Sequence, residues 1–84
     1  MNALDEFYLC RTEVPTPLTG KLVMIEGDEN YEDILGIHLG CFRNTRWDRE
    51  GKYIFHSILS REGTVQEYCL NVGERVEGII KVIG

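Results

Sequence analysis

The chain has 84 residues, a length that allows one small domain and is too short for two. Its hydrophobic fraction of 43% and charged fraction of 27% are typical of a globular protein and exclude a wholly disordered chain. The net charge of -5 opposes nonspecific binding to nucleic acid. We therefore expect one folded domain, residues 1–84, of modest stability, because so short a chain buries only roughly 60–65% of its unfolded surface.

The cysteine content indicates in which cellular compartment the protein is expected. Three cysteines are an odd number and are too few for the disulfide framework of a small secreted protein. Residues 1–6 show no basic segment followed by an apolar one, and no apolar run is long enough to span a bilayer. These features predict reduced thiols, a cytoplasmic protein and no association with membranes.

Two strands are predicted in the first third of the chain. Residues 7–14 are rich in aromatic and β-branched side chains and stop at Pro15, which is typical of a strand. Residues 18–26 contain four consecutive apolar side chains at positions 22–25, which favours a strand covered on both faces. Gly20 is a candidate β-bulge in this second strand.

The pattern of residues 30–42 fits two structures. As a helix, this segment would start at an Asn30 cap, have acidic residues in its first turn and end at Gly40. As a strand, Leu35, Ile37, Leu39 and Cys41 would share one face, with His38 on the other. Because the cap, dipole and stop signals agree, we favour the helix.

The last third of the chain predicts a β-meander. Strands are expected over residues 52–59, 64–70 and 75–83, separated by turns in which Gly63 and Gly73 take left-handed conformations. Together with the first two strands, this gives a mainly β fold with at most one short helix near residues 30–40. The fold class expected is a small five-stranded antiparallel barrel or curled sheet, SH3-like or OB-like. The apolar segment 79–83, if it lies at a sheet edge, would favour a homodimer.

The residues available for catalysis or metal binding form no recognised motif. Cys41 beside His38, or Cys69 facing His56, could act as a nucleophile, but cysteines in apolar runs are usually inert buried thiols. The spacing His38-x-x-Cys41 supplies half of a zinc site, which Cys10, His56 or Cys69 would have to complete. Since no second pair of ligands is evident, we expect no metal, no cofactor and no enzymatic activity.

A calcium loop and a phosphate loop are also not supported. Asp28, Asn30 and Glu32 alternate like the first ligands of an EF-hand, but the sixth position is Asp33 and the twelfth is Leu39. The nine glycines match no phosphate-binding pattern and are explained by turns and bulges.

Two groups of residues in polar segments are the candidate binding sites. The first is Trp47 with Arg43, Arg46 and Arg49, since tryptophan and arginine predominate at interface hot spots. An alternative is that Trp47 closes an open barrel end, with an arginine stacked on its indole. The second group is the acidic segment around Tyr31, which could meet an arginine-rich surface or imitate phosphates. Its candidate residues are Tyr31, Asp28, Glu29 and Glu32.

These features favour a small non-enzymatic binding module that acts through a protein-protein interface. An inhibitor or adaptor, such as a virus-encoded antagonist, would have this profile by analogy. The alternative is a single-stranded nucleic-acid-binding barrel, with Trp47, Tyr53 and Phe55 stacking on bases and Lys52 among the cations that contact phosphates. A dimer that binds a small molecule is a further alternative.

Overall fold

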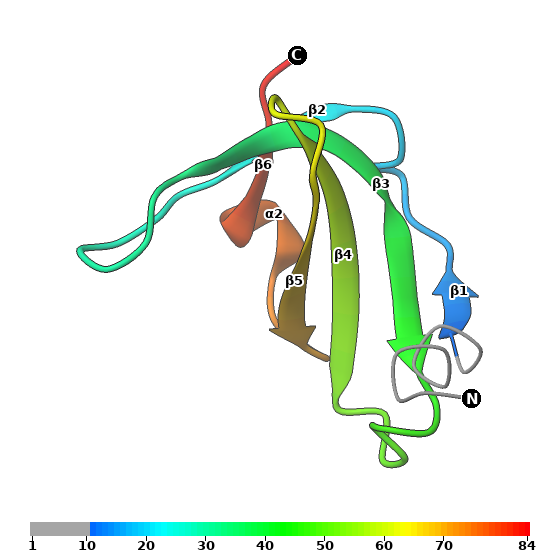
Figure 1. The fold of residues 1–84 in the computed structure, drawn as a ribbon. Coiled ribbons are helices and arrows are strands. Elements are labelled where there is room, and N and C mark those ends of the chain that lie inside the picture. The colour runs from blue at the N-terminus through cyan, green and yellow to red at the C-terminus, as the bar shows by residue number, and fades with distance from the viewer. Residues whose placement is uncertain (1–10) are drawn as a thin grey trace.

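The computed structural model describes residues 11–84, which form one antiparallel sheet of six strands with one short helix (Figure 1). The elements are β1 (Arg11–Val14), β2 (Leu22–Ile25), β3 (Ile34–Asn44), β4 (Tyr53–Ser60), β5 (Val65–Asn71), α2 (Val76–Ile79) and β6 (Ile80–Val82). The mainly β, antiparallel fold predicted from the sequence is confirmed, with six strands rather than five. Among the described residues, no helix has the length and hydrophobicity that a membrane crossing requires.

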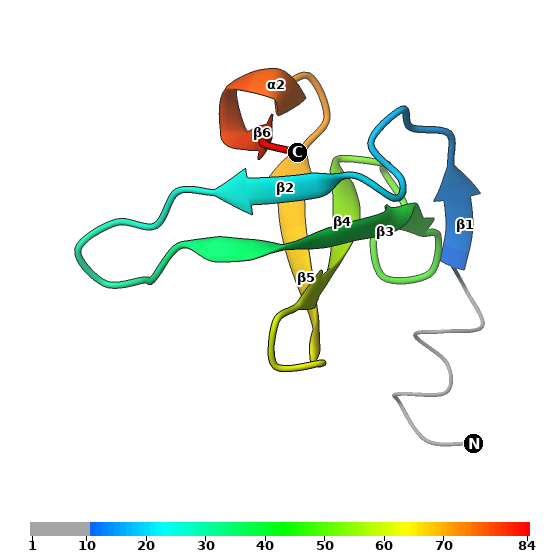
Figure 2. The same ribbon diagram turned by 90° about the horizontal axis from the view of Figure 1, so that it is seen from above.

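The strand order is β5-β4-β3-β2-β6, and β1 pairs with the far end of β3. The first half of β3 pairs with β2 and its second half with β1, so the eleven-residue β3 belongs to two parts of a bent sheet. The sheet curls without closing into a barrel; β6 extends it as the edge strand next to β2, and α2 packs against the core (Figure 2).

The interior of the curl is a small apolar core. Alternate residues of the strands point inward, and the fully buried apolar residues come from four different strands. They are Val23, Ile25, Ile58, Leu70 and Ile80. Tyr68, Val76 and Ile79 pack against this set from its margins, so the short helix closes one side of the core.

The helix predicted for residues 30–42 is wrong, because this segment contains most of β3. The acidic side chains that resembled a helix start instead bind the backbone of a turn. Asp28 accepts hydrogen bonds from the backbone N–H groups of Asn30 (2.8 Å) and Tyr31 (3.1 Å), and Asp33 accepts one from Gly27 (2.7 Å). Aspartates compete with helical hydrogen bonding in this way, so residues 26–33 form the loop between β2 and β3.

The predicted meander is confirmed for its first two strands and wrong for its third. Gly63 (φ 83°) and Gly73 (φ 99°) occupy the left-handed region, as the turns required. After Gly73, however, the chain forms α2 and then β6, which pairs with β2 on the opposite side of the sheet. The predicted strand at residues 7–14 is confirmed for Arg11–Val14, and its first four residues lie outside the described part of the chain.

Gly36 allows β4 to approach β3 closely. A Cβ at this position would overlap the backbone carbonyl of Leu59 and come within 2.9 Å of Ile58 Cγ2. We predict that Gly36→Ala lowers the free energy of unfolding by about 1–3 kcal/mol, the range typical of an overpacked core, as measured by urea denaturation. Gly78→Ala is the matched control, since nothing lies within 4 Å of a Cβ there and alanine suits a helix. Equal stability of the two variants would contradict this account.

Candidate functional site

Two side chains determine the conformation of the loop that contains Trp47. Buried Asn44 accepts hydrogen bonds through Oδ1 from the backbone N–H groups of Trp47 (2.8 Å) and Arg46 (3.2 Å). Asp48 accepts them from Lys52 (3.0 Å) and Tyr53 (2.8 Å). The loop between β3 and β4 is therefore braced at both ends by its own sequence.

The pKa of Asp48 reflects this bracing. Desolvation alone would raise the pKa of the carboxyl. The backbone N–H groups of Lys52, Tyr53 and Gly51, together with the charge of Arg43, outweigh that effect and hold the pKa below its ordinary value of 3.8. The charged form of Asp48 is thus the form that stabilises the loop.

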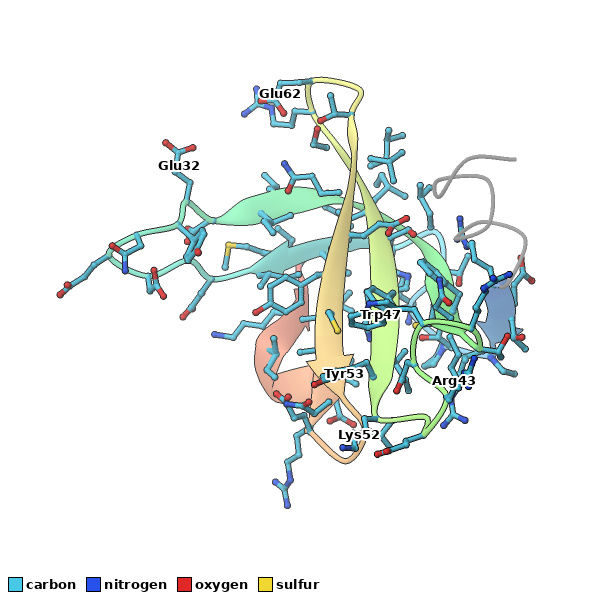
Figure 3. The ribbon with its side chains drawn as sticks, turned by 60° about the horizontal axis from the view of Figure 1, so that its bottom comes forward. Glu32, Arg43, Trp47, Lys52, Tyr53 and Glu62 are labelled. Carbon is cyan, nitrogen blue, oxygen red and sulfur yellow. The ribbon has the colours of Figure 1, made fainter. Side chains whose placement is uncertain are left out.

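The indole of Trp47 is 63% exposed and rests against β4 (Figure 3). Its ring centroid lies 5.7 Å from Tyr53, with tilted planes, and 5.7 Å from Phe55, edge to face. Phe55 in turn stacks on Phe42 at 5.2 Å, and the guanidinium of Arg11 lies 3.8 Å above the Phe42 ring. The result is a continuous aromatic group on the outer face of β3 and β4, and Trp47 is its most exposed ring.

The three candidate arginines lie in or next to the loop that contains Trp47. Arg43 lies near the end of β3, while Arg46 and Arg49 lie in the loop, and all three are exposed. Lys52 forms an ion pair with Glu50 at 2.8 Å. The structure therefore brings together the residues of the first predicted site, along with Tyr53 and Phe55.

The acidic candidates lie elsewhere. Tyr31, Asp28, Glu29 and Glu32 are all exposed on the hairpin between β2 and β3, which projects from the body of the sheet (Figures 1 and 3). This hairpin and the Trp47 loop stand at opposite ends of β3. The two predicted groups are therefore separate surfaces.

An apolar patch on the outer face was not identified from the sequence. Ile37, Leu59 and Val65 are directly paired across β3, β4 and β5, and their side chains are 37%, 37% and 55% exposed. Leu39 is 44% exposed nearby on β3. The alternation of residues 53–59 shows which side chains share a face of β4. It could not identify the exposed patch, because the sequence does not show which face the rest of the protein covers.

A second cluster lies on the inner face, where His38, Cys41 and His56 are all buried. Residues three apart on a regular strand point to opposite faces. Here β3 contains a bulge between His38 and Gly40, since His38 pairs with Ile58 while Gly40 pairs with Ser57. The extra residue, Leu39, returns Cys41 to the face of His38, directly opposite His56.

The strand pattern considered from the sequence, with His38 and Cys41 on opposite faces, is thereby corrected. Gly40 has a φ of 145°, a conformation that favours glycine. Cys69, the other candidate partner of His56, lies opposite Phe55 on β5 and is exposed, while Cys10 lies outside the described residues. Of the three groups considered to complete the His38-Cys41 pair, the described structure therefore brings His56 to it.

The atoms of this inner cluster are in contact. His38 Nε2 lies 3.0 Å from His56 Nδ1, which lies 3.1 Å from Cys41 Sγ, and Cys41 Sγ lies 3.9 Å from His38 Nε2. Burial lowers the pKa of His38, and burial together with the charge of His38 lowers the pKa of His56 to about 4. Burial raises the pKa of Cys41, opposed by a hydrogen bond with Thr16.

These shifts bear on the cysteine-nucleophile hypothesis. A nucleophilic cysteine must be a thiolate, which a neighbouring imidazolium or helix N-terminus would stabilise. Near pH 7, Cys41 is instead a thiol beside two neutral imidazoles. The cluster does not favour covalent catalysis.

A cavity of about 500 Å³ opens next to the inner cluster. Cys41 and His56 contribute to its wall, which also includes Thr16 and Pro17 of the β1–β2 connection and Ile80 of β6. The cavity occupies the side on which the sheet fails to close. The buried thiol and one imidazole therefore border this cavity.

Comparison with protein-family models, curated proteins and solved structures found no match.

The charge of Asp48 should make the loop sensitive to acid. Because the folded-state pKa lies below 3.8, the stabilising contribution is present above that value and is lost as the pH falls through the folded-state pKa. We predict that Asp48→Asn lowers the urea midpoint at neutral pH and that the difference from wild type disappears at pH values well below 3.8. A difference that stays constant over this range would mean that the carboxylate charge is irrelevant.

Proposed function

We propose that this protein is a small non-enzymatic binding module whose Trp47 surface docks on a protein partner. The single observation that supports this most is that a 63% exposed indole is held in one position. Large exposed aromatic side chains lose apolar contact with water when a partner covers them, and tryptophan and arginine are the most frequent interface hot spots. Trp47 and its three arginines combine both residue types.

The bracing of the loop strengthens this proposal. Binding is weakened by the entropy lost when side chains and loops become ordered. Asn44 and Asp48 already order the loop through four backbone hydrogen bonds, and Tyr53 and Phe55 support the indole. Little conformational entropy would therefore remain to be lost on association.

The partner should have an apolar patch with acidic groups at its edge. The apolar side chains of Ile37, Leu59 and Val65 extend the outer face beyond the aromatic group, and an exposed apolar surface of this kind marks interaction sites. Arg43, Arg46 and Arg49 at the other end favour carboxylates of the partner. The acidic hairpin, being at the far end of β3, would steer the approach or contact a second surface.

Within this proposal the protein acts by occupying the surface of its partner, as an inhibitor or adaptor does. A virus-encoded antagonist would be one example. A cytoplasmic location fits the free thiols Cys41 and Cys69. Homodimerisation through β6 is compatible with it, because β6 lies at an edge of the described sheet and Val82 and Ile83 are 45% and 49% exposed.

The second candidate function is binding of single-stranded nucleic acid. Trp47, Tyr53 and Phe55, the three rings expected to stack on bases, lie together, and Arg43 and Lys52 are close by in the sequence. The net charge of -5 and the Lys52–Glu50 ion pair count against it.

Trp47 should be required for binding and dispensable for folding. We predict that Trp47→Ala abolishes capture of the partner from an extract of the source cells and leaves the thermal midpoint nearly unchanged, because the exposed indole adds little to the core. Val72→Ala is the control, an exposed apolar residue after β5 that belongs to neither candidate group and whose truncation should leave capture intact. If Trp47→Ala instead lowers the midpoint by many degrees, the indole is a structural cap.

Charge reversal provides an independent test. Arg46→Glu and Arg49→Glu together should slow association with the captured partner, and the loss should shrink at high salt, as measured by surface plasmon resonance. An unchanged association rate would exclude the arginines from the interface.

A labelled single-stranded oligonucleotide distinguishes the second candidate. Because Trp47 is the only tryptophan, stacking of bases on it should quench the fluorescence of the protein. Nucleic-acid binding requires this quenching at low salt and its decrease at higher salt. We expect no quenching at either salt concentration.

A further inference from the structure

The inner cluster of His38, Cys41 and His56 is unusual for a structural core. All three side chains are at least 94% buried, and His38 Nδ1 has no hydrogen-bond partner among the described residues. An unsatisfied buried polar group costs about 1–3 kcal/mol, which an apolar residue in its place would avoid. Such groups in a native core call for an explanation other than packing.

The distances within the cluster match the ligand triangle of a tetrahedral metal. Zinc-nitrogen bonds of about 2.0–2.1 Å and zinc-sulfur bonds of about 2.3 Å place two nitrogens about 3.3 Å apart, and a nitrogen and a sulfur about 3.6 Å apart. The observed separations are 3.0 Å between the nitrogens and 3.1 and 3.9 Å from the sulfur. Shifts of a few tenths of an ångström would bring these three separations to the values expected for zinc ligands.

The donor set and its surroundings favour zinc. Two imidazole nitrogens and one thiolate sulfur suit a borderline-soft cation, and zinc accepts three protein ligands with a fourth position left to water or another molecule. Cys41 and His56 face the cavity, which would give the fourth position access to it. The Thr16 hydroxyl, which hydrogen-bonds to Cys41 and accepts the N–H of Leu18 at 3.3 Å, would support the thiolate.

We propose that His38, Cys41 and His56 form a zinc-binding site whose fourth coordination position opens into the cavity beside β6. On binding, Cys41 gives up its thiol proton to solvent, and the two neutral imidazoles donate their lone pairs. Zinc would then add a cross-link between β3 and β4 where Cys41 already pairs with His56, and a domain this small gains stability from a structural metal. The site lies on the inner face, so it does not depend on the protein-binding surface.

Cobalt titration of the full chain tests this site. The chain is purified with chelator and reductant, and the chelator is then removed. The protein should bind one Co²⁺ and show the sulfur-to-cobalt charge-transfer band together with the visible bands of tetrahedral cobalt. Zn²⁺ should displace the cobalt. A double variant, Cys10→Ser with Cys69→Ser, keeps Cys41 as the sole thiol and should give the same spectrum. Adding Cys41→Ser should remove the charge-transfer band, and His56→Gln should weaken binding at least about tenfold.

Several outcomes would overturn the proposal. The proposal fails if the wild type shows no charge-transfer band, or if the band persists after Cys41→Ser. It also fails if the double variant Cys10→Ser with Cys69→Ser does not show the band. Thermal denaturation gives a second readout, since Zn²⁺ should raise the midpoint of the wild type and not that of His56→Gln. Trp47→Ala should bind cobalt like the wild type, which separates this site from the protein-binding surface.

Discussion

The bulge at Leu39 and Gly40 determines which side chains of β3 enter the interior. Before the bulge, Gly36 and His38 face inward, and without an extra residue Cys41 would face outward. The insertion reverses the alternation of β3 at one point, so that Cys41 joins His56 on the inner face and Phe42 joins Phe55 on the outer face. The inner cluster and the aromatic group both depend on this reversal, which is possible because glycine accepts the backbone conformation at position 40.

The sheet stays open because β3 pairs with two different strands along one of its edges. Its first half pairs with β2 and its second half with β1, and neither β5 nor β6 finds a partner that would close the curl among the described residues. Closure is left to side chains and to the short helix α2, which add apolar contacts at the margin of the core. The cavity beside β6 is the space that remains, and it explains why the buried side chains of Cys41 and His56 still border an opening.

The parts predictable from the sequence were those governed by local rules. Gly63 and Gly73 marked their turns because the left-handed conformation is a property of the residue, and the strands at 53–60 and 65–71 followed from their apolar pattern. The helix hypothesis for 30–42 failed because Asp28 and Asp33 bind turn backbone, a choice that depends on the pairing of β2 with β3. The composition of the Trp47 loop was enough to identify it as a candidate site. The grouping of His38, Cys41 and His56 depends on the bulge in β3, and a single glycine is the only sign of that bulge in the sequence.

Neighbouring residues on β3 and β4 belong to different surfaces, since Cys41 and His56 point inward while Phe42 and Phe55 point outward. One pair of strands thus carries both proposed sites. Their residues alternate along the strands, but the two sites lie on opposite faces of the sheet. On the proposed assignment, substitutions at exposed outer positions such as Trp47 would alter recognition of a partner and leave the interior as it is. For a protein with a single small core, this separation makes rapid variation of one surface compatible with keeping the fold.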